Sequence, residues 1–447
     1  MKILLCSLLI LAVTAFAYIP GTAAESVTNT DSPVSPLATT GNQTYNGSPF
    51  GILGPYEYWS NSPKVISKAD INSLMTDLGV KWVDELPFDL PNLTSDMNAY
   101  TRVGSTSGIT PPNIDYSRYV PLLNNQISSL KDRVKYYEID TEPVGGLSPW
   151  SGNAVKYAEF LKQSYSIIKS VCSDCYVVLG GLPGAGINVS SNDQNSTFLT
   201  TILNDNASKY FDVFEFKQHF HTLKDYRIIK TRKDTYEKIL SNYGIDITKI
   251  PVFLETAMYS GNPQSSINTL TPQTDNDQAI GVVKTYVYAL SIGVNKIFWN
   301  DVMELYNFGG NPKDPFNFYG LVNNKNNDGY SFKKLSYYTY KKMVETLEGS
   351  DWKNITTVLD SGGVFVCRFT KNGKYTWVVW NDNPTASTVN LTSTSLSPLK
   401  VTVSVPNATW GWQISDYSSS FIPTTIAVNG GHFNVVAGKV PFYVEEQ

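Results

Sequence analysis

The stretch Val-Lys-Tyr-Tyr-Glu-Ile-Asp-Thr-Glu at residues 134–142 decides the fold that we expect for this chain of 447 residues. Apolar and charged side chains alternate in it, as in a β-strand with two unlike faces. Glu138, Asp140 and Glu142 share one face, and the apolar Ile139 lies on the other. In a barrel strand the apolar face meets the helices, so the charged face is expected to point inward and towards the mouth.

Strand-like and helical patterns alternate from about residue 49 to residue 348. Strand ends recur every roughly 40 residues, which predicts an α/β fold with a closed (β/α)8 TIM barrel. The strand-like runs are Phe50–Leu53, Lys81–Glu85, Val134–Glu142, Tyr176–Leu182, Phe211–His219, Pro251–Glu255 and Lys296–Asn300, with a weak one near Tyr100–Gly104. The helical stretches are Ser67–Leu78, Tyr116–Lys131, Ala154–Val171, Thr235–Tyr243, Asp277–Ile292 and Leu335–Leu347. The glycine-dense segment Gly180–Gly186 lacks the helix start of a phosphate loop, so it is interpreted as a loop after a strand.

The pattern changes past residue 348, where short strands with polar turns replace the helices. This pattern predicts a C-terminal antiparallel β-sandwich over 349–447, after a barrel over 49–348. Residues 18–48 are rich in Ser, Thr, Asn, Gly and Pro, which predicts a linker or N-terminal arm. The strands expected in the sandwich are Gly363–Arg368, Tyr375–Asn381, Thr388–Leu391, Val401–Val405, Ile422–Val428 and His432–Val436.

Residues 1–17 have the pattern of a signal peptide, with Lys2 before an apolar run and a small-residue cleavage site at Ala15–Ala17. No later segment supplies 18 consecutive apolar residues, so we expect a secreted or extracellular protein with no membrane insertion beyond the signal peptide. Nine glycosylation sequons agree with a secreted glycoprotein. They begin at Asn42, Asn46, Asn92, Asn188, Asn195, Asn206, Asn354, Asn390 and Asn407.

The composition of the chain indicates which classes of partner and cofactor to expect. The net charge of −4 gives no basic face for nucleic acid, so no nucleic-acid partner is expected. Aromatic residues make up 13% of the chain, which suits either a large core or surfaces that stack on sugars. Cys172 and Cys175 predict a local disulfide in an exported chain, against redox, metal and free-thiol alternatives. We expect no metal and no organic cofactor.

Two carboxylates, Glu142 and Glu255, each end a predicted strand. Taken singly, Glu142 before Pro143 could cap a loop, and Glu255 before Thr256 could cap a helix. Taken together, two carboxylates at the mouth of one barrel are what hydrolysis of a glycosidic bond requires. One protonates the leaving oxygen, and the other attacks or stabilises the anomeric carbon.

Several short motifs resemble the clan A retaining glycoside hydrolases. They occur in the family's order, and Gly320–Val322 with Lys334–Tyr338 is similar to the closing segment of the β-xylosidase and α-L-iduronidase branch. That branch also carries a small β-sandwich after its barrel. The other motifs are Glu142-Pro143, Phe253-Leu254-Glu255-Thr256 and Ile297-Phe298-Trp299-Asn300.

The resemblance implies roles for four of these residues. Glu142 would be the acid/base, Glu255 the nucleophile, and Trp299 with Asn300 part of the sugar subsite. Thr141 departs from the family, which has Asn before the acid/base to hydrogen-bond the sugar 2-hydroxyl. Either another residue makes that contact, or the substrate differs at C2, or activity has been lost.

Further residues are candidates for binding substrate. His219 and His221 are sugar-hydroxyl donors, structural histidines or, without a third ligand in evidence, a zinc pair. Asp84 and Glu85 either contact substrate or form a buried ion pair. Aromatic residues that suit either sugar stacking or the core are Trp59, Trp150, Tyr259 and Trp299.

These observations predict an exported glycosidase (O-glycosyl hydrolase) that cleaves oligo- or polysaccharides with retention, by double displacement. The alternative is a non-catalytic carbohydrate-binding or cell-surface glycoprotein on the same barrel. A third class is an extracellular structural or adhesion glycoprotein.

Overall fold

The computed structural model describes residues 47–54, 67–85, 97–104, 111–144, 148–184, 193–220, 222–264, 270–328, 332–408 and 414–447. All of them belong to one compact unit, residues 43–447. The expected signal peptide and nearly all of the N-terminal arm lie outside the described residues, so these two segments and the domain boundaries stay predictions. No helix in the described ranges is long and apolar enough to cross a membrane.

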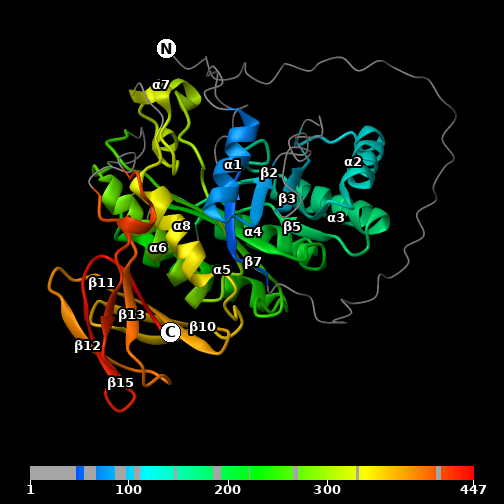
Figure 1. Ribbon diagram of the computed structural model, residues 1–447. Coiled ribbons are helices and arrows are strands. Elements are labelled where there is room, and N and C mark those ends of the chain that lie inside the picture. Colours follow the sequence, from blue (N-terminus) through cyan, green and yellow to red (C-terminus); the bar gives the residue numbers. More distant parts are fainter. Residues whose placement is uncertain are drawn as a thin grey trace. The chain divides into compact units, whose positions relative to one another are not determined.

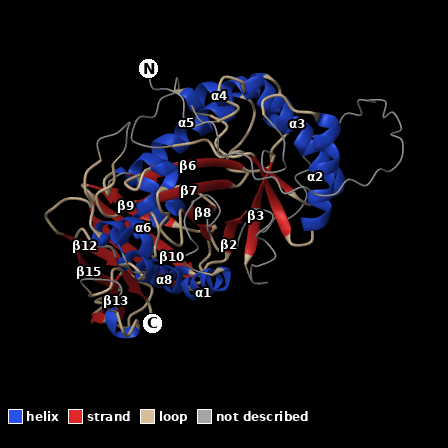
Figure 2. Cartoon of the chain, turned by 90° about the horizontal axis from the view of Figure 1, so that it is seen from above, coloured by secondary structure: helices blue, strands red, loops and turns tan. Residues whose placement is uncertain are grey.

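Eight parallel strands form one sheet in the order β5-β4-β3-β2-β1-β8-β7-β6. Parallel bridges from Val178 to Val213 and from Leu182 to Phe216 join β5 to β6, so the sheet closes on itself. This confirms the TIM barrel, whose strands lie inside a ring of helices in Figure 2. The strands are β1 Phe50–Leu53, β2 Trp82–Glu85, β3 Asn98–Val103, β4 Val134–Ile139, β5 Tyr176–Leu179, β6 Phe214–Phe220, β7 Val252–Met258 and β8 Lys296–Trp299.

The helices begin and end where local sequence signals occur. Ser67 caps the first helix by accepting a hydrogen bond from the backbone N–H of Asp70, and Gly79 ends it at φ 74°. Thr274 and Asp277 form a capping box at α6. The helices are α1 Lys68–Leu78, α2 Tyr116–Leu130, α3 Ala154–Val171, α4 Gln194–Asn204, α5 Ile228–Asn242, α6 Asp275–Ser291, α7 Lys325–Asp328 and α8 Leu335–Leu347 (Figure 1).

The C-terminal strands form an antiparallel six-stranded sheet, ordered β14-β13-β16-β11-β10-β9, and a two-stranded sheet of β12 and β15. Trp377, Val379 and Phe433 belong to the apolar core that the two sheets share, which confirms the β-sandwich. The strands are β9 Thr356–Ser361, β10 Val364–Lys371, β11 Lys374–Asn381, β12 Ser387–Thr392, β13 Leu399–Val403, β14 Thr424–Ile426, β15 His432–Ala437 and β16 Phe442–Glu445.

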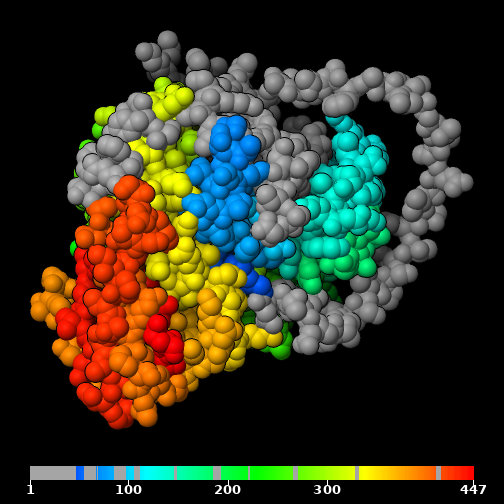
Figure 3. All heavy atoms as spheres, viewed as in Figure 1, coloured from blue at the N-terminus to red at the C-terminus, as the bar shows by residue number. Residues whose placement is uncertain are grey.

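The sandwich contacts the barrel through charged and aromatic side chains. Asp382 accepts hydrogen bonds from Lys284 of α6 at 2.8 Å and from Tyr226 at 2.6 Å. Tyr417 stacks on Tyr338 of α8, with ring centroids 6.2 Å apart. Figure 3 shows the orange and red atoms of the C-terminal strands beside the yellow atoms of α8.

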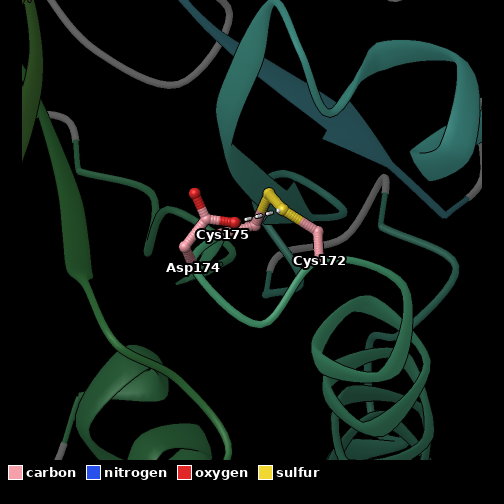
Figure 4. Close-up of side chains that lie close together, drawn as sticks. All are labelled: Cys172, Asp174 and Cys175. Carbon is pink, nitrogen blue, oxygen red and sulfur yellow. Dashed lines mark hydrogen bonds between the residues drawn. A yellow bond between two sulfur atoms is a disulfide. The ribbon is translucent and has the colours of Figure 1, made fainter.

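The cysteine prediction is confirmed. Cys172, just after α3, is bonded to Cys175, just before β5, with their Cα atoms 5.3 Å apart (Figure 4). Asp174 lies beside them, so the three residues have the spacing of a metal site. Because the two sulfurs are bonded to each other, they offer no thiolate ligands. Cys367 is free and buried.

Candidate active site

A layer of buried charges lines the barrel towards the carboxyl ends of its strands. Alternate strand residues face the interior, so four of these charges each lie two positions beyond an apolar residue of a lower layer: Asp84, Arg102, Glu215 and Glu255. The lower layer contains Trp82, Tyr100, Val178, Val213, Phe253 and Phe298. The charged layer contains Asp84, Arg102, Glu138, Glu215, Lys217 and Glu255.

The two predicted catalytic carboxylates are both present near this layer, but neither ends a strand as expected. β7 continues past Glu255 because Thr256–Met258 still pair with β6. β4 stops at Ile139, since Asp140 and Glu142 have positive φ values of 54° and 47°. Glu255 therefore lies inside a rigid strand, whereas Glu142 lies in the segment that follows β4.

Glu255 is buried among donors. Lys217 forms an ion pair with its Oε2, and Arg102 lies 3.6 Å from the same oxygen. Asn300 donates to Oε1 at 3.1 Å, and His219 Nε2 lies 3.3 Å from it. Burial alone raises the pKa of Glu255, but Lys217, His219 and Arg102 outweigh it and hold that pKa well below its usual range. Glu255 is therefore a carboxylate at neutral pH.

Glu142 has a different environment. Its side chain is 43% exposed, and its backbone N–H donates to the carbonyl of Gly181 at 3.1 Å. Its Oε1 lies 3.9 Å from Nζ of Lys217, the same ammonium that pairs with Glu255. The two carboxylates therefore face the same ammonium, which brings them close together at the mouth of the barrel.

Arg102 supports the base of the site. It donates to Asp84 Oδ2 at 2.5 Å and to Glu138 Oε2 at 3.0 Å. Asp84 therefore forms the buried ion pair that was one of its two predicted roles, while the side chain of Glu85 lies outside the described residues. The sequence did not single out Arg102, because its strand was the weakest predicted. The alternation of Tyr100 and Arg102 was the available signal.

Glu215 is a buried acid of another kind. Its Oε2 is hydrogen-bonded to the hydroxyl of Tyr100, and its Oε1 has no hydrogen-bond partner among the described residues. Burial, with the nearby charge of Glu138, raises the pKa of Glu215 well above its usual value. Its surroundings therefore favour the protonated form, unlike those of Glu255.

The structure brings two predicted binding residues to Glu255, namely His219 and Asn300. The ring of His219 packs edge-on against Phe316, with centroids 5.4 Å apart. His221 and Trp59 lie outside the described residues, so their predicted roles stay predictions.

Three aromatic candidates lie in the core, the second interpretation that the sequence left open. Trp299 is fully buried, faces α6 and donates through Nε1 to the carbonyl of Tyr319 at 3.2 Å. The adjacent Phe298 takes the interior position, so the expected sugar platform is not formed by Trp299. Tyr259 and Trp150 are also buried, with hydrogen bonds to Thr271 and Asp140 respectively.

Thr141 precedes Glu142 at the position where the resemblance predicts Asn. Its Oγ1 is enclosed and has no hydrogen-bond partner among the described residues. The oxygen is therefore not presented to solvent in the structure. A buried hydroxyl in this state is unfavourable, because it has lost its hydrogen bonds to water and gained none from the protein.

No protein-family model and no curated protein matches the chain. Solved structures with the same fold do match. An arabinofuranosidase covers 90% of this chain and 97% of its own, at 12% identity and a TM-score of 0.62. An α-L-arabinofuranosidase from Thermotoga maritima covers 89% and 96%, at 12% identity and 0.60. A monomeric β-xylosidase from Caulobacter crescentus covers 89% and 96%, at 14% identity and 0.56. At these identities the similarity establishes the fold.

Proposed function

We propose that this protein is an exported glycoside hydrolase that cleaves O-glycosidic bonds with retention. The observation that carries the proposal is the pairing of two unlike carboxylates on one ammonium. Glu255 is buried and ionised, whereas Glu142 is half-exposed and stands across Lys217 from it. A nucleophile and an acid/base need such different environments.

In the first step an oxygen of Glu255 attacks the anomeric carbon while Glu142 donates its proton to the leaving oxygen. In the second step Glu142 takes a proton from water, and the water oxygen displaces Glu255. The contact of both groups with Lys217 supports retention over inversion, because retaining glycosidases hold their two carboxyl groups closer together than inverting ones.

The substrate class is proposed from the structural relatives. These relatives include an α-L-arabinofuranosidase, a xylanase, a β-xylosidase and a glucosidase. We therefore place aryl α-L-arabinofuranosides, β-xylosides and β-glucosides first in a substrate panel, followed by the corresponding polysaccharides. Product anomers followed by NMR distinguish retention from inversion, and absence of hydrolysis across the panel would count against the proposal.

Glu142 has its own test. Glu142→Ala should still form the glycosyl-enzyme from substrates with good leaving groups, because those need little protonation, but not from alkyl glycosides. Its second step should be slow on both, because the base that activates water is missing. Added azide should restore turnover and give a glycosyl azide of retained configuration. A variant that is equally active on both substrate types would remove Glu142 from the role.

The non-catalytic alternative is supported by one observation, the enclosed Oγ1 of Thr141. If the site is active, Thr141→Asn should raise kcat/KM on 2-hydroxy sugars by about tenfold, the equivalent of one neutral hydrogen bond. The 2-deoxy analogues should not respond. Sugar binding without hydrolysis in both proteins would favour a carbohydrate-binding protein.

Export is proposed from the N-terminal sequence and the sequons. Asn206, Asn354, Asn390 and Asn407 are exposed, as glycosylation requires. Asn195 instead donates to the carbonyl of Pro183 at 2.5 Å, so it should stay unmodified. Mass spectrometry of the protein from a eukaryotic secretory host tests this difference between the sites.

A further inference from the structure

Lys217 of β6 lies between Glu142 and Glu255, although a mechanism with two carboxylates does not by itself need a cation there. Its side chain is 3% exposed, so water screens its charge little. Burial lowers the pKa of Lys217, but Glu255, Glu142 and Glu138 together outweigh burial and raise that pKa well above its usual value. The residue is therefore a fixed cation between Glu255 and Glu142.

Two glycines make room for this lysine. A Cβ on Gly181 would lie 2.8 Å from Cε of Lys217 and 2.9 Å from Oε1 of Glu215. A Cβ on Gly184 would lie 2.1 Å from the backbone oxygen of Lys217. The glycine-dense segment after β5 thus lets the backbone approach β6 closely, and the position of Lys217 is built into the barrel.

We propose that Lys217 switches Glu142 from general acid to general base during the catalytic cycle. The proposal rests on the retaining mechanism proposed above. In the free enzyme the carboxylate of Glu255 compensates the ammonium at contact distance, so Glu142 faces a nearly neutral ion pair. Glu142 can then hold the proton that the first step needs.

The first step removes this compensation. A Glu255 oxygen bonds to the anomeric carbon, the glycosidic C–O bond breaks, and the proton of Glu142 passes to the leaving oxygen. Glu255 is now a neutral ester, and the ammonium of Lys217 faces the new carboxylate of Glu142. An opposite charge at this distance favours the ionised form, which is the form that removes a proton from water.

The second step returns the charges. The water oxygen bonds to the anomeric carbon, the bond from that carbon to Glu255 breaks, and Glu142 keeps the water's proton. The carboxylate of Glu255 reforms against Lys217, so the same cation stabilises the leaving group. Other charged or titratable groups that face Lys217 are Arg102, Glu138, Glu215 and Asp84. Among the described residues, Lys217 is the ion-pair partner of Glu142.

The test compares Lys217→Met with the wild type on an aryl glycoside whose good leaving group makes the second step rate-limiting. The variant should show a burst of released phenol, followed by a steady state slowed about tenfold or more. The fall of kcat at acidic pH should begin at a pH about one unit higher, which we call a shift of the acid limb. An opposite charge shifts a carboxylate by about 1–3 units, and the low end applies because Glu142 is half-exposed.

Asn300→Ala is the matched control. It removes a hydrogen bond to the other oxygen of Glu255, and among the described residues Asn300 makes no contact with Glu142, so the variant should slow both steps and leave the acid limb in place. Lys217→Arg should restore the acid limb, since it restores the charge. If circular dichroism shows that Lys217→Met is unfolded, Lys217→Gln is measured in the same way.

The outcomes separate the two proposals. A wild type that retains configuration, with an unmoved acid limb in the neutral variants, overturns the switch and leaves the proposed function standing. A wild type that neither hydrolyses the panel nor becomes labelled at Glu255 by 2-fluoro glycosides overturns the proposed function, and the switch with it.

Discussion

On β2, β3 and β7 the two layers inside the barrel lie two residues apart and have opposite chemistry. On β7, Phe253 belongs to the apolar layer and Glu255 to the charged one. On β3, Tyr100 and Arg102 repeat the pattern. Apolar burial stabilises the fold, whereas buried charges are costly unless they are paired. The comparison indicates that one end of the barrel maintains the structure and the other holds the candidate chemistry.

The largest expected effect comes from the charged layer. Glu255→Gln keeps the size of the side chain but removes the nucleophile, so, if Glu255 is the nucleophile proposed above, kcat should fall by at least about 10³-fold on all substrates. The measurement is steady-state hydrolysis of an activated aryl glycoside.

Glu215→Gln is the matched control in the same layer. The surroundings of Glu215 favour its protonated form, and it is hydrogen-bonded to Tyr100, so the amide should be tolerated with kcat within a few-fold of the wild type. Equal losses in the two variants would show that the layer responds as a unit and would remove the special role of Glu255.

Phe253→Ala should have the opposite outcome. It leaves a cavity in the apolar layer, so the free energy of unfolding should fall by about 3–5 kcal/mol. The kcat of the folded fraction should change little. Urea unfolding and active-site titration measure the two quantities separately. A variant that is as stable as the wild type but inactive would contradict the division between the layers.

Acid stability should also distinguish the layers. The pKa of Glu255 is held below its unfolded value of about 4.5, so its stabilising contribution is present above pH 4.5 and is lost as pH falls further. Below that pH the wild type should lose up to about 1.4 kcal/mol per pH unit more than Glu255→Gln. If the stabilities of the wild type and of Glu255→Gln fall in parallel from pH 7 to pH 3, Glu255 does not stabilise the fold through its ion pairs.

The smallest effect is expected for the disulfide, which precedes β5 at the apolar end of the barrel. Replacing Cys172 and Cys175 together by Ser should cost about 1–2 kcal/mol, because a short loop restricts the unfolded chain little. Activity should not change. Intact mass before and after reduction establishes whether the bond is present, and a loss of activity in the double variant would couple the disulfide to the site.

Much of the architecture could be predicted because its signals are local. Alternation over residues 134–139, the helical period of α3 and the Cys172–Cys175 spacing each depend on nearby residues. Helix α4 was missed because Gln, Asn, Ser and Thr give its first turns a weak helical signal. Its buried residues Phe198 and Ile202 contact the core only in the folded chain.

The sequence by itself determined the strand–helix alternation, the change to a sandwich and the two carboxylates Glu142 and Glu255 as candidates. The tertiary structure alone decided what surrounds them. It placed Lys217 between the two groups and turned Trp299 into the core. The physical reason is that the period of a strand indicates only which of its residues share one face of the sheet. Which faces meet across the barrel, and at what height, depends on strands that are far apart in the chain.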